Sequence, residues 1–137
     1  MTVRRVDQGM AVAAANALPA KVDRELRTQY KQLRVMLSSA GLAATYAFIA
    51  SKSGEGGEGQ GTLAGAYREA ARGIREQLAD RGLLTCEPRT MRVGEVMRQL
   101  GQMDPVRYAR ASAEAAAFAG WLSRLADAAY LERGEDA

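Results

Sequence analysis

Apolar residues recur along the chain every three or four positions, which is the spacing of a helix with one buried face. After Pro19 the apolar positions are Val22, Leu26, Tyr30, Leu33 and Leu37. The same spacing returns between residues 62 and 81 and between residues 105 and 132. No segment alternates apolar and polar residues for long enough to form a strand. The pattern therefore predicts an all-α protein, and the 27 alanines against 16 β-branched residues favour helix as well.

Residues that start or stop helices flank these periodic segments. A first helix would begin at Asp7, an N-cap residue, and end before Pro19. Gly41 and Gly82 occupy C-cap positions, and Asp104 followed by proline is a typical helix start. The expected helices span residues 7–18, 20–41, 42–53, 62–81, 93–102 and 105–132. We predict a small bundle of five to six helices with a long C-terminal helix.

A chain of 137 residues has the length of one domain. We expect an N-terminal helix over residues 1–19, a single helical-bundle domain over residues 20–133 and a frayed tail at residues 134–137. Residues 53–61 hold five of the 14 glycines and no apolar side chain, which predicts a flexible Gly/Glu-rich connector. This segment lacks the Gly-Lys-Ser/Thr ending of a phosphate-binding loop and follows no strand, so that role is not assigned to it.

The composition excludes several classes of function. The chain has no histidine, which excludes histidine-based triads and most zinc sites, and its one cysteine, Cys86, cannot form an intrachain disulfide. The carboxylates are scattered, with no activated nucleophile beside them. No apolar run approaches the roughly 20 residues of a membrane span, and Asp7 and Asn16 interrupt the N-terminal run that resembles a secretory signal. We expect a cytoplasmic protein that is not an enzyme and has no metal, cofactor or membrane partner.

Basic residues form rows on two of the predicted helices, although the formal net charge is only +3. Arg24, Arg27, Lys31 and Arg34 recur at i, i+3, i+7 and i+10, and so form one stripe about 120° from the apolar face. Arg68, Arg72 and Arg75 form a second row, with Glu69, Glu76 and Asp80 beyond it on an expected exposed face. Such rows can follow a phosphate backbone without reading bases. The alternative is that they are ordinary solvated faces.

Trp121 has two possible roles. Its helical angle places it about 90° from the core face of the last helix, on the same side as Arg110 and Arg124. A neighbouring helix could cover it, because tryptophan side chains in small helical bundles are usually largely buried. Alternatively, Trp121 and Arg110 could contact a partner, because aromatic and arginine side chains are common anchors of interfaces.

Two blocks of sequence resemble a known family. The first joins Gly41-Leu42 to the block AFIASK at residues 47–52. The second joins Tyr108-Ala109-Arg110 to the block WLSRLA at residues 121–126. In this order, with a basic helix before them and an arginine-bearing helix between them, they resemble the small α-helical subunit of type III-B CRISPR effector (Cmr) complexes. The resemblance covers most of residues 20–132, and the long glycine-rich connector departs from the family pattern.

The resemblance implies a subunit without enzymatic activity, which stacks with other copies of itself in the inner filament of an RNA-guided, RNA-targeting complex. Its partners would be the backbone subunits, the large palm-domain subunit and the guide–target RNA duplex. Base pairing would supply sequence specificity, while the protein contacts phosphates. Lys52 and Arg124 match basic positions of the family pattern. The predicted RNA-binding residues are Arg24, Arg27, Lys31, Arg34, Lys52, Arg68, Arg72, Arg75 and Arg124.

Two other functions fit parts of the sequence. One is a helical protein–protein adaptor whose arginine stripes pair with acidic surfaces of a partner. The other is a small helical DNA-binding regulator, but the helix after Gly41 is apolar and is therefore unsuited to recognition in the major groove.

Overall fold

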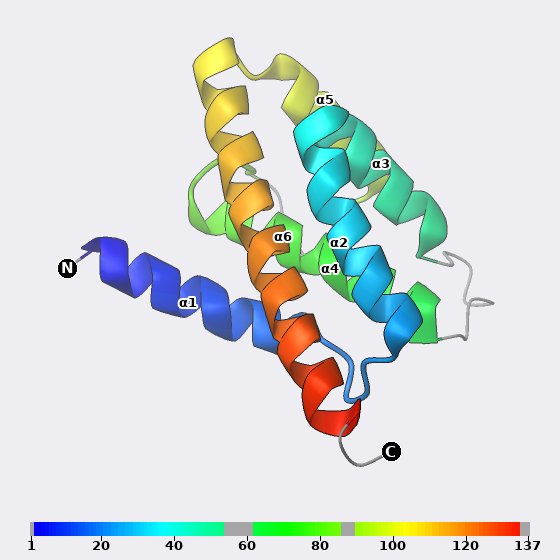
Figure 1. Ribbon diagram of the computed structural model, residues 1–137. Helices are drawn as coiled ribbons and strands as arrows, with labels where there is room; N and C mark the ends of the chain where they lie inside the picture. The colour runs from blue at the N-terminus through cyan, green and yellow to red at the C-terminus, as the bar shows by residue number, and fades with distance from the viewer. Residues whose placement is uncertain (1, 54–61, 86–89, 135–137) are drawn as a thin grey trace.

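The computed structural model describes residues 2–53, 62–85 and 90–134, and these residues form six helices and no strand (Figure 1). The helices are α1 (Thr2–Ala17), α2 (Arg24–Ser39), α3 (Leu42–Lys52), α4 (Thr62–Asp80), α5 (Val93–Gln102) and α6 (Pro105–Gly134). The all-α prediction is confirmed, including the long C-terminal helix of 30 residues. Within the described ranges, none of the helices has the length and apolarity needed to cross a membrane.

Four predicted helix limits differ from the structure by two residues or more. α1 already begins at Thr2, so the prediction that Asp7 caps it is wrong. The helix can extend this far because the residues before Asp7 include no glycine or proline. α2 begins at Arg24 rather than at residue 20, because the Asp23 carboxylate accepts a hydrogen bond from the backbone N–H of Leu26 at 2.9 Å. α2 ends at Ser39, and α6 extends two residues beyond its predicted end.

Gly41 separates α2 from α3 rather than capping α2 at its C-terminus. Its φ of +94° lies in the region that favours glycine, and this conformation turns the chain between the two helices. The N-terminus of α3 has no side-chain cap of its own. Instead, the hydroxyl of Tyr108 on α6 accepts a hydrogen bond from the backbone N–H of Ala43 at 3.1 Å.

Three predicted features fall outside the described residues. These are residues 54–61 of the connector, the loop around Cys86, and residues 135–137 of the tail. Ser53, the first residue of the predicted connector, is described and forms the C-cap of α3.

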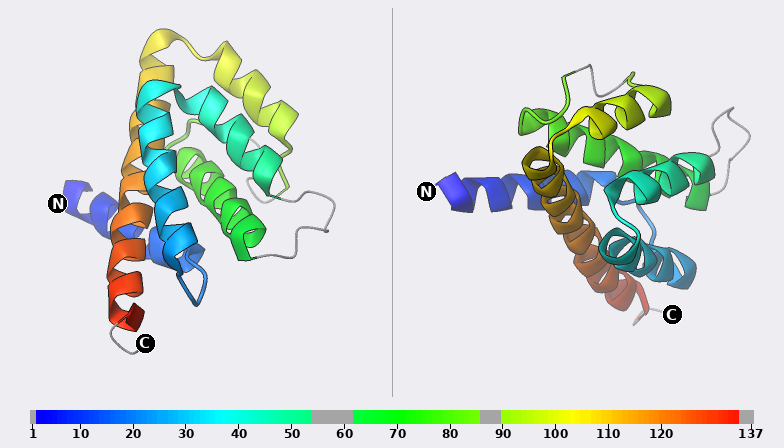
Figure 2. Two further views of the ribbon diagram at one scale, coloured as in Figure 1. Left: turned by 45° about the vertical axis from the view of Figure 1, so that its right-hand side comes forward. Right: turned by 90° about the horizontal axis from the view of Figure 1, so that it is seen from above.

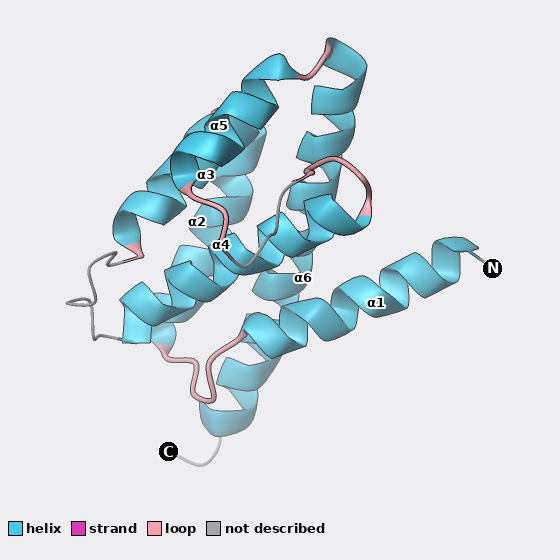
Figure 3. Ribbon diagram, turned by 180° about the vertical axis from the view of Figure 1, so that it is seen from behind, coloured by secondary structure: helices cyan, strands magenta, loops and turns pink. Residues whose placement is uncertain are grey.

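α6 is the central helix of the bundle. It packs against α2, α1 and α4 and also contacts α3, while α3 packs against α4 and α5. Figures 1 and 2 show α2 and α6 side by side, with α1 crossing behind α6. Seen from the opposite side, α1 and α4 lie in front of α6 (Figure 3). The molecule thus has one face built by α2 and α6 and another built by α1 and α4.

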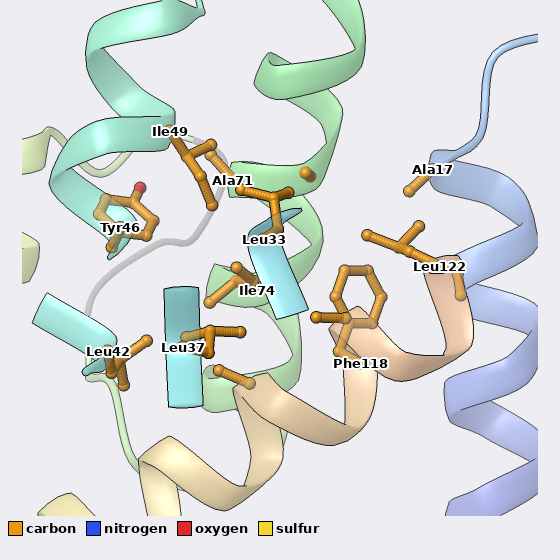
Figure 4. Packing of buried hydrophobic residues seen from close by; sticks show 14 of the residues in the cluster. Ala17, Leu33, Leu37, Leu42, Tyr46, Ile49, Ala71, Ile74, Phe118 and Leu122 are labelled. Atoms are coloured by element: carbon orange, nitrogen blue, oxygen red, sulfur yellow. The ribbon is translucent and has the colours of Figure 1, made fainter. Parts of the chain in front are cut away.

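One hydrophobic core joins all six helices. The predicted inward residues of α2 are buried, as are Tyr67, Ala71, Ile74 and Leu78 of α4. α6 contributes Ala111, Ala115, Phe118 and Leu122, and α1 contributes Met10, Ala14 and Ala17. Figure 4 shows Phe118 and Leu122 beside Ile74 and Leu33 in this core. The inward positions predicted on α2, α4 and α6 are therefore buried, except that Leu63, Tyr108, Leu125 and Ala129 are partly buried.

Gly73 allows α4 to approach the central helix closely. Both Gly73 and the Phe118 side chain are buried. A Cβ atom added to Gly73 would lie 2.3 Å from Cζ and 2.7 Å from Cε2 of the Phe118 ring, closer than atoms can pack. The ring therefore occupies the space that a side chain at position 73 would need.

Gly73→Ala should reduce the free energy of unfolding by about 1–3 kcal/mol, because Phe118 must leave its position in a packed core. Gly65→Ala is the matched control, since Gly65 lies in the same helix and an added Cβ there meets no atom within 4 Å. This control should be neutral or stabilising by up to about 1 kcal/mol. Urea denaturation followed by far-ultraviolet circular dichroism measures both values. Equal effects of the two substitutions would contradict the packing account.

Candidate nucleic-acid interface

Four basic residues of α2 lie along one side of that helix, as their spacing predicts. Arg24, Lys31 and Arg34 are exposed, and Arg27 is half-buried. Arg24 and Arg34 form no ion pair or hydrogen bond within the described residues. Their guanidinium groups are therefore available to an external anion.

The two middle cations of the stripe contact an acidic residue of the central helix. The Arg27 Nε–H donates to Oδ1 of Asp127 at 2.7 Å, and Nζ of Lys31 lies 3.7 Å from the same oxygen. The Arg27 guanidinium also lies 4.8 Å from the centroid of the Tyr130 ring, a cation–π distance. These contacts fix two cations of α2 against α6.

The same contacts determine the charge state of Asp127. The hydrogen bond from Arg27 lowers the pKa of Asp127 below its usual value, and the positive charge of Lys31 lowers it further. Burial raises the pKa and is the second-largest influence after the hydrogen bond from Arg27, but the lowering influences together prevail. Asp127 therefore remains ionised at neutral pH and neutralises part of the stripe.

α6 adds a further cation beside this contact. Arg124 is exposed and lies one helical turn before Asp127, with its guanidinium 5.6 Å from the Trp121 ring. We use the term α2–α6 basic face for Arg24, Arg27, Lys31, Arg34 and Arg124 together with Asp127. Helix packing thus brings together predicted RNA-binding residues that are about 90 residues apart in the sequence.

Lys52 and Arg68 form a smaller basic pair at the end of α3. Both are exposed. Nζ of Lys52 lies 5.6 Å from the Phe48 ring centroid, and the Arg68 guanidinium donates to the backbone carbonyl of Ser53 at 2.9 Å. That carbonyl belongs to the C-terminus of α3, where a cation is electrostatically favoured. The pair is separate from the α2–α6 basic face.

Arg72 and Arg75 make internal contacts on α4. Arg72 donates a hydrogen bond to Glu69 and lies 3.9 Å from Glu76, and the bond to Glu69 raises the pKa of Arg72. The Arg75 guanidinium donates to the hydroxyl of Tyr46 on α3 at 2.8 Å. Glu69 and Glu76 lie three residues before and four residues after Arg72, a spacing at which opposite charges pair on a helix. Both arginine side chains are half-buried.

The acidic row of α4 is less exposed than its spacing predicts. Asp80 is exposed, but Glu69 and Glu76 are half-buried and line a groove between α1 and α4. The prediction of one exposed acidic face is wrong for these two residues, because α1 extends across this side of the molecule (Figure 3).

The two residues predicted to contact a partner lie on α6. Arg110 is exposed and has no hydrogen bond or ion pair within the described part of the chain. Trp121 is half-buried and packs against the core, with Arg124 beside its ring. Its ring therefore contributes to the core and still leaves part of its surface accessible.

The described residues offer no cluster of three or more His, Cys, Asp or Glu side chains that could hold a metal ion. Several of their carboxylates contact basic side chains instead. Asp127 contacts Arg27 and Lys31, Glu69 and Glu76 contact Arg72, and Glu114 lies 3.4 Å from Arg81.

Asp127 is the residue of this interface that the sequence did not identify. Its partner Arg27 is 100 residues away in the chain, so no local spacing connects the two. The only local signal is that Asp127 follows Arg124 by three residues, a spacing at which opposite charges are neighbours on a helix.

Asp127→Asn should reduce the free energy of unfolding at pH 7 by up to about 1 kcal/mol, because the ion pairs are about one-third exposed to solvent. A carboxylate whose pKa is lowered by folding stabilises the protein above the unfolded-state pKa of about 4. The difference between wild type and variant should therefore shrink as pH falls through the lowered pKa of Asp127. Urea titrations across acidic pH test this, and a deficit that persists undiminished in strong acid would contradict it.

Comparison with known families identifies the chain. It matches the family described as CRISPR-associated protein (Cas_Cmr5) over residues 5–129, which include α2 to α5 completely and most of α1 and α6. Comparison with curated proteins and with solved structures gives no significant match. Membership of this family implies a place in a multi-subunit effector complex. The predicted resemblance is confirmed, and the chain belongs to the Cas_Cmr5 family, the small subunits of type III-B (Cmr) CRISPR effector complexes.

Proposed function

We propose that this chain is a non-catalytic subunit that holds the guide–target RNA of the effector complex through its α2–α6 basic face. The observation that carries the proposal is the position of five cations on two adjacent helices, with Asp127 contacting two of them. Rigid helices present these cations at fixed spacing, which suits a regular phosphate backbone. Contacts of this kind position RNA without reading its sequence.

The pair Lys52 and Arg68 extends this proposal. It lies at the end of α3 and would contact a more distant part of the same RNA. Arg72 and Arg75 would act differently from the other predicted residues, because their guanidinium groups already bind Glu69 and the Tyr46 hydroxyl. Their contribution would be to hold α4 in place.

The remaining features of the proposal come from family membership. Copies of the chain would stack in the inner filament of the complex, beside the backbone subunits and the large palm-domain subunit, in the cytoplasm. A non-catalytic role is supported by the absence of histidine from the sequence and by the pairing of acidic side chains with arginines and lysine. One copy would bind RNA weakly, and stacking would add the contacts of many copies.

Replacing Arg24 and Arg34 with alanine should weaken binding of short single-stranded RNA by a similar factor for any sequence. Each lost phosphate contact should reduce the slope of log K against log salt by about 0.7. Arg98→Ala is the matched control, because Arg98 is an exposed arginine on α5. Fluorescence anisotropy at several salt concentrations measures all three proteins.

An unchanged affinity and slope in the Arg24/Arg34 variant would refute the assignment of this face. If wild type bound no RNA at low salt, while a protein partner bound the same arginines, the adaptor function would be correct instead.

A further inference from the structure

The face of the molecule built by α1 and α4 contains a groove of about 430 Å³. Its α1 wall is apolar and is formed mainly by Met10, Val12, Ala13 and Ala17. Val12 is 59% exposed although it is a large aliphatic side chain. Val12 therefore adds exposed apolar surface to the α1 wall of the groove.

The α4 side of the groove carries three carboxylates and two arginines, and therefore a small net negative charge. It carries Glu69, Glu76 and Asp80, and Arg72 pairs with the first two. Arg81 at the end of the groove is near Glu114 of α6. Asp80 is exposed and has no ion pair within the described residues. The groove therefore favours a partner that is apolar and carries a positive charge, and it disfavours RNA.

The first half of α6 presents a surface of that chemistry. Val106 is 71% exposed, and one to three turns later Ala109, Arg110, Ala113 and Ala117 are exposed on the same side of the helix. We call these five residues the outer face of α6. The alanines leave the helix backbone accessible to close packing. Arg110 supplies an unpaired positive charge in the middle of the row.

We propose that the outer face of α6 of one copy docks in the α1–α4 groove of the next copy. The lengths agree, because Val106 to Ala117 and Glu69 to Asp80 each comprise twelve residues, or about 16 Å of helix between the end residues. Val106 and the alanines would cover Val12 and the apolar wall. Arg110 would lie against the carboxylates of Glu76 and Asp80.

The two surfaces lie on different sides of the molecule. Figure 1 shows α6 with no helix in front of it, and Figure 3 shows α1 and α4 on the opposite side. A contact between two different surfaces leaves one of each free on every pair, so further copies can add in the same way. This inference rests on the proposed stacking of copies and names the two surfaces that meet. It also assigns Arg110 to protein contact rather than to RNA.

Sedimentation equilibrium of the full chain over a range of concentrations tests the docking. The wild-type mass should rise above 14.7 kDa as concentration increases. Val12→Arg in the groove, and Arg110→Glu with Ala113→Glu on α6, should each weaken association at least tenfold. Val35→Glu is the matched control, because Val35 is 63% exposed on α2, outside both surfaces, and should associate like wild type.

Mixing the groove variant with the α6 variant gives a second test. Each variant keeps one intact surface, so the mixture should regain association that neither variant shows alone. A wild-type chain that stays monomeric at millimolar concentration would overturn the proposal. A groove variant or an α6 variant that associates like wild type would also overturn it, as would a mixture of the two that remains monomeric.

RNA affinity measured on the same proteins at low concentration separates this inference from the proposed function. The groove variant should bind RNA as wild type does. Intact RNA binding with unaltered self-association would refute the docking alone. Loss of association in both variants, with no RNA binding by wild type, would refute the RNA function and leave the docking in place.

Discussion

The packing of Phe118 against Gly73 is the constraint on which the arrangement of the bundle depends. Phe118 lies at the centre of α6, the helix that contacts four of the other five, and the missing side chain at position 73 lets α4 reach it. With α4 held at this distance, α1 can lie across both helices and form the groove. α2 occupies the other side of α6, where Arg27 reaches Asp127. The close contact in the core thus fixes how near α4 lies to α6, and with it the position of the carboxylates in the groove.

Helical periodicity predicts much of this fold. The apolar rows of α2, α4 and α6 are buried where their spacing places them, because helix packing in a small bundle follows the apolar face of each helix. Helix ends are less predictable. Asp7 and Asp23 are both of a residue type that is common at N-caps. α1 begins before Asp7, at Thr2, whereas Asp23 caps α2 through its hydrogen bond with the backbone N–H of Leu26. The hydroxyl of Tyr108, which caps α3, comes from a helix 65 residues away.

For the charged residues, the sequence predicts their positions on each helix but not their contacts with other helices. Spacing correctly places the α2 cations on one side of the helix, because that depends only on helix geometry. It does not show that Asp127 contacts two of them, or that α1 covers Glu69 and Glu76, because these depend on how the helices pack. Arg34 and Arg72 are both predicted to bind RNA, and both belong to a row of basic residues on a helix. In the structure Arg34 has no ion pair or hydrogen bond within the described residues, whereas Arg72 is bound by two glutamates.

The molecule separates most of its charges, with cations on the α2–α6 basic face and Glu69, Glu76 and Asp80 in the groove between α1 and α4. Asp127 is the exception, because it is an acidic residue within the basic face. The most direct measurement is the affinity of Asp127→Asn for single-stranded RNA, compared with Asp80→Asn, which changes the net charge equally but lies in the groove. Asp127→Asn should bind RNA several-fold more tightly than Asp80→Asn, because it frees Arg27 and Lys31 for phosphate. Equal or weaker binding by Asp127→Asn would contradict the claim that RNA lies on this face.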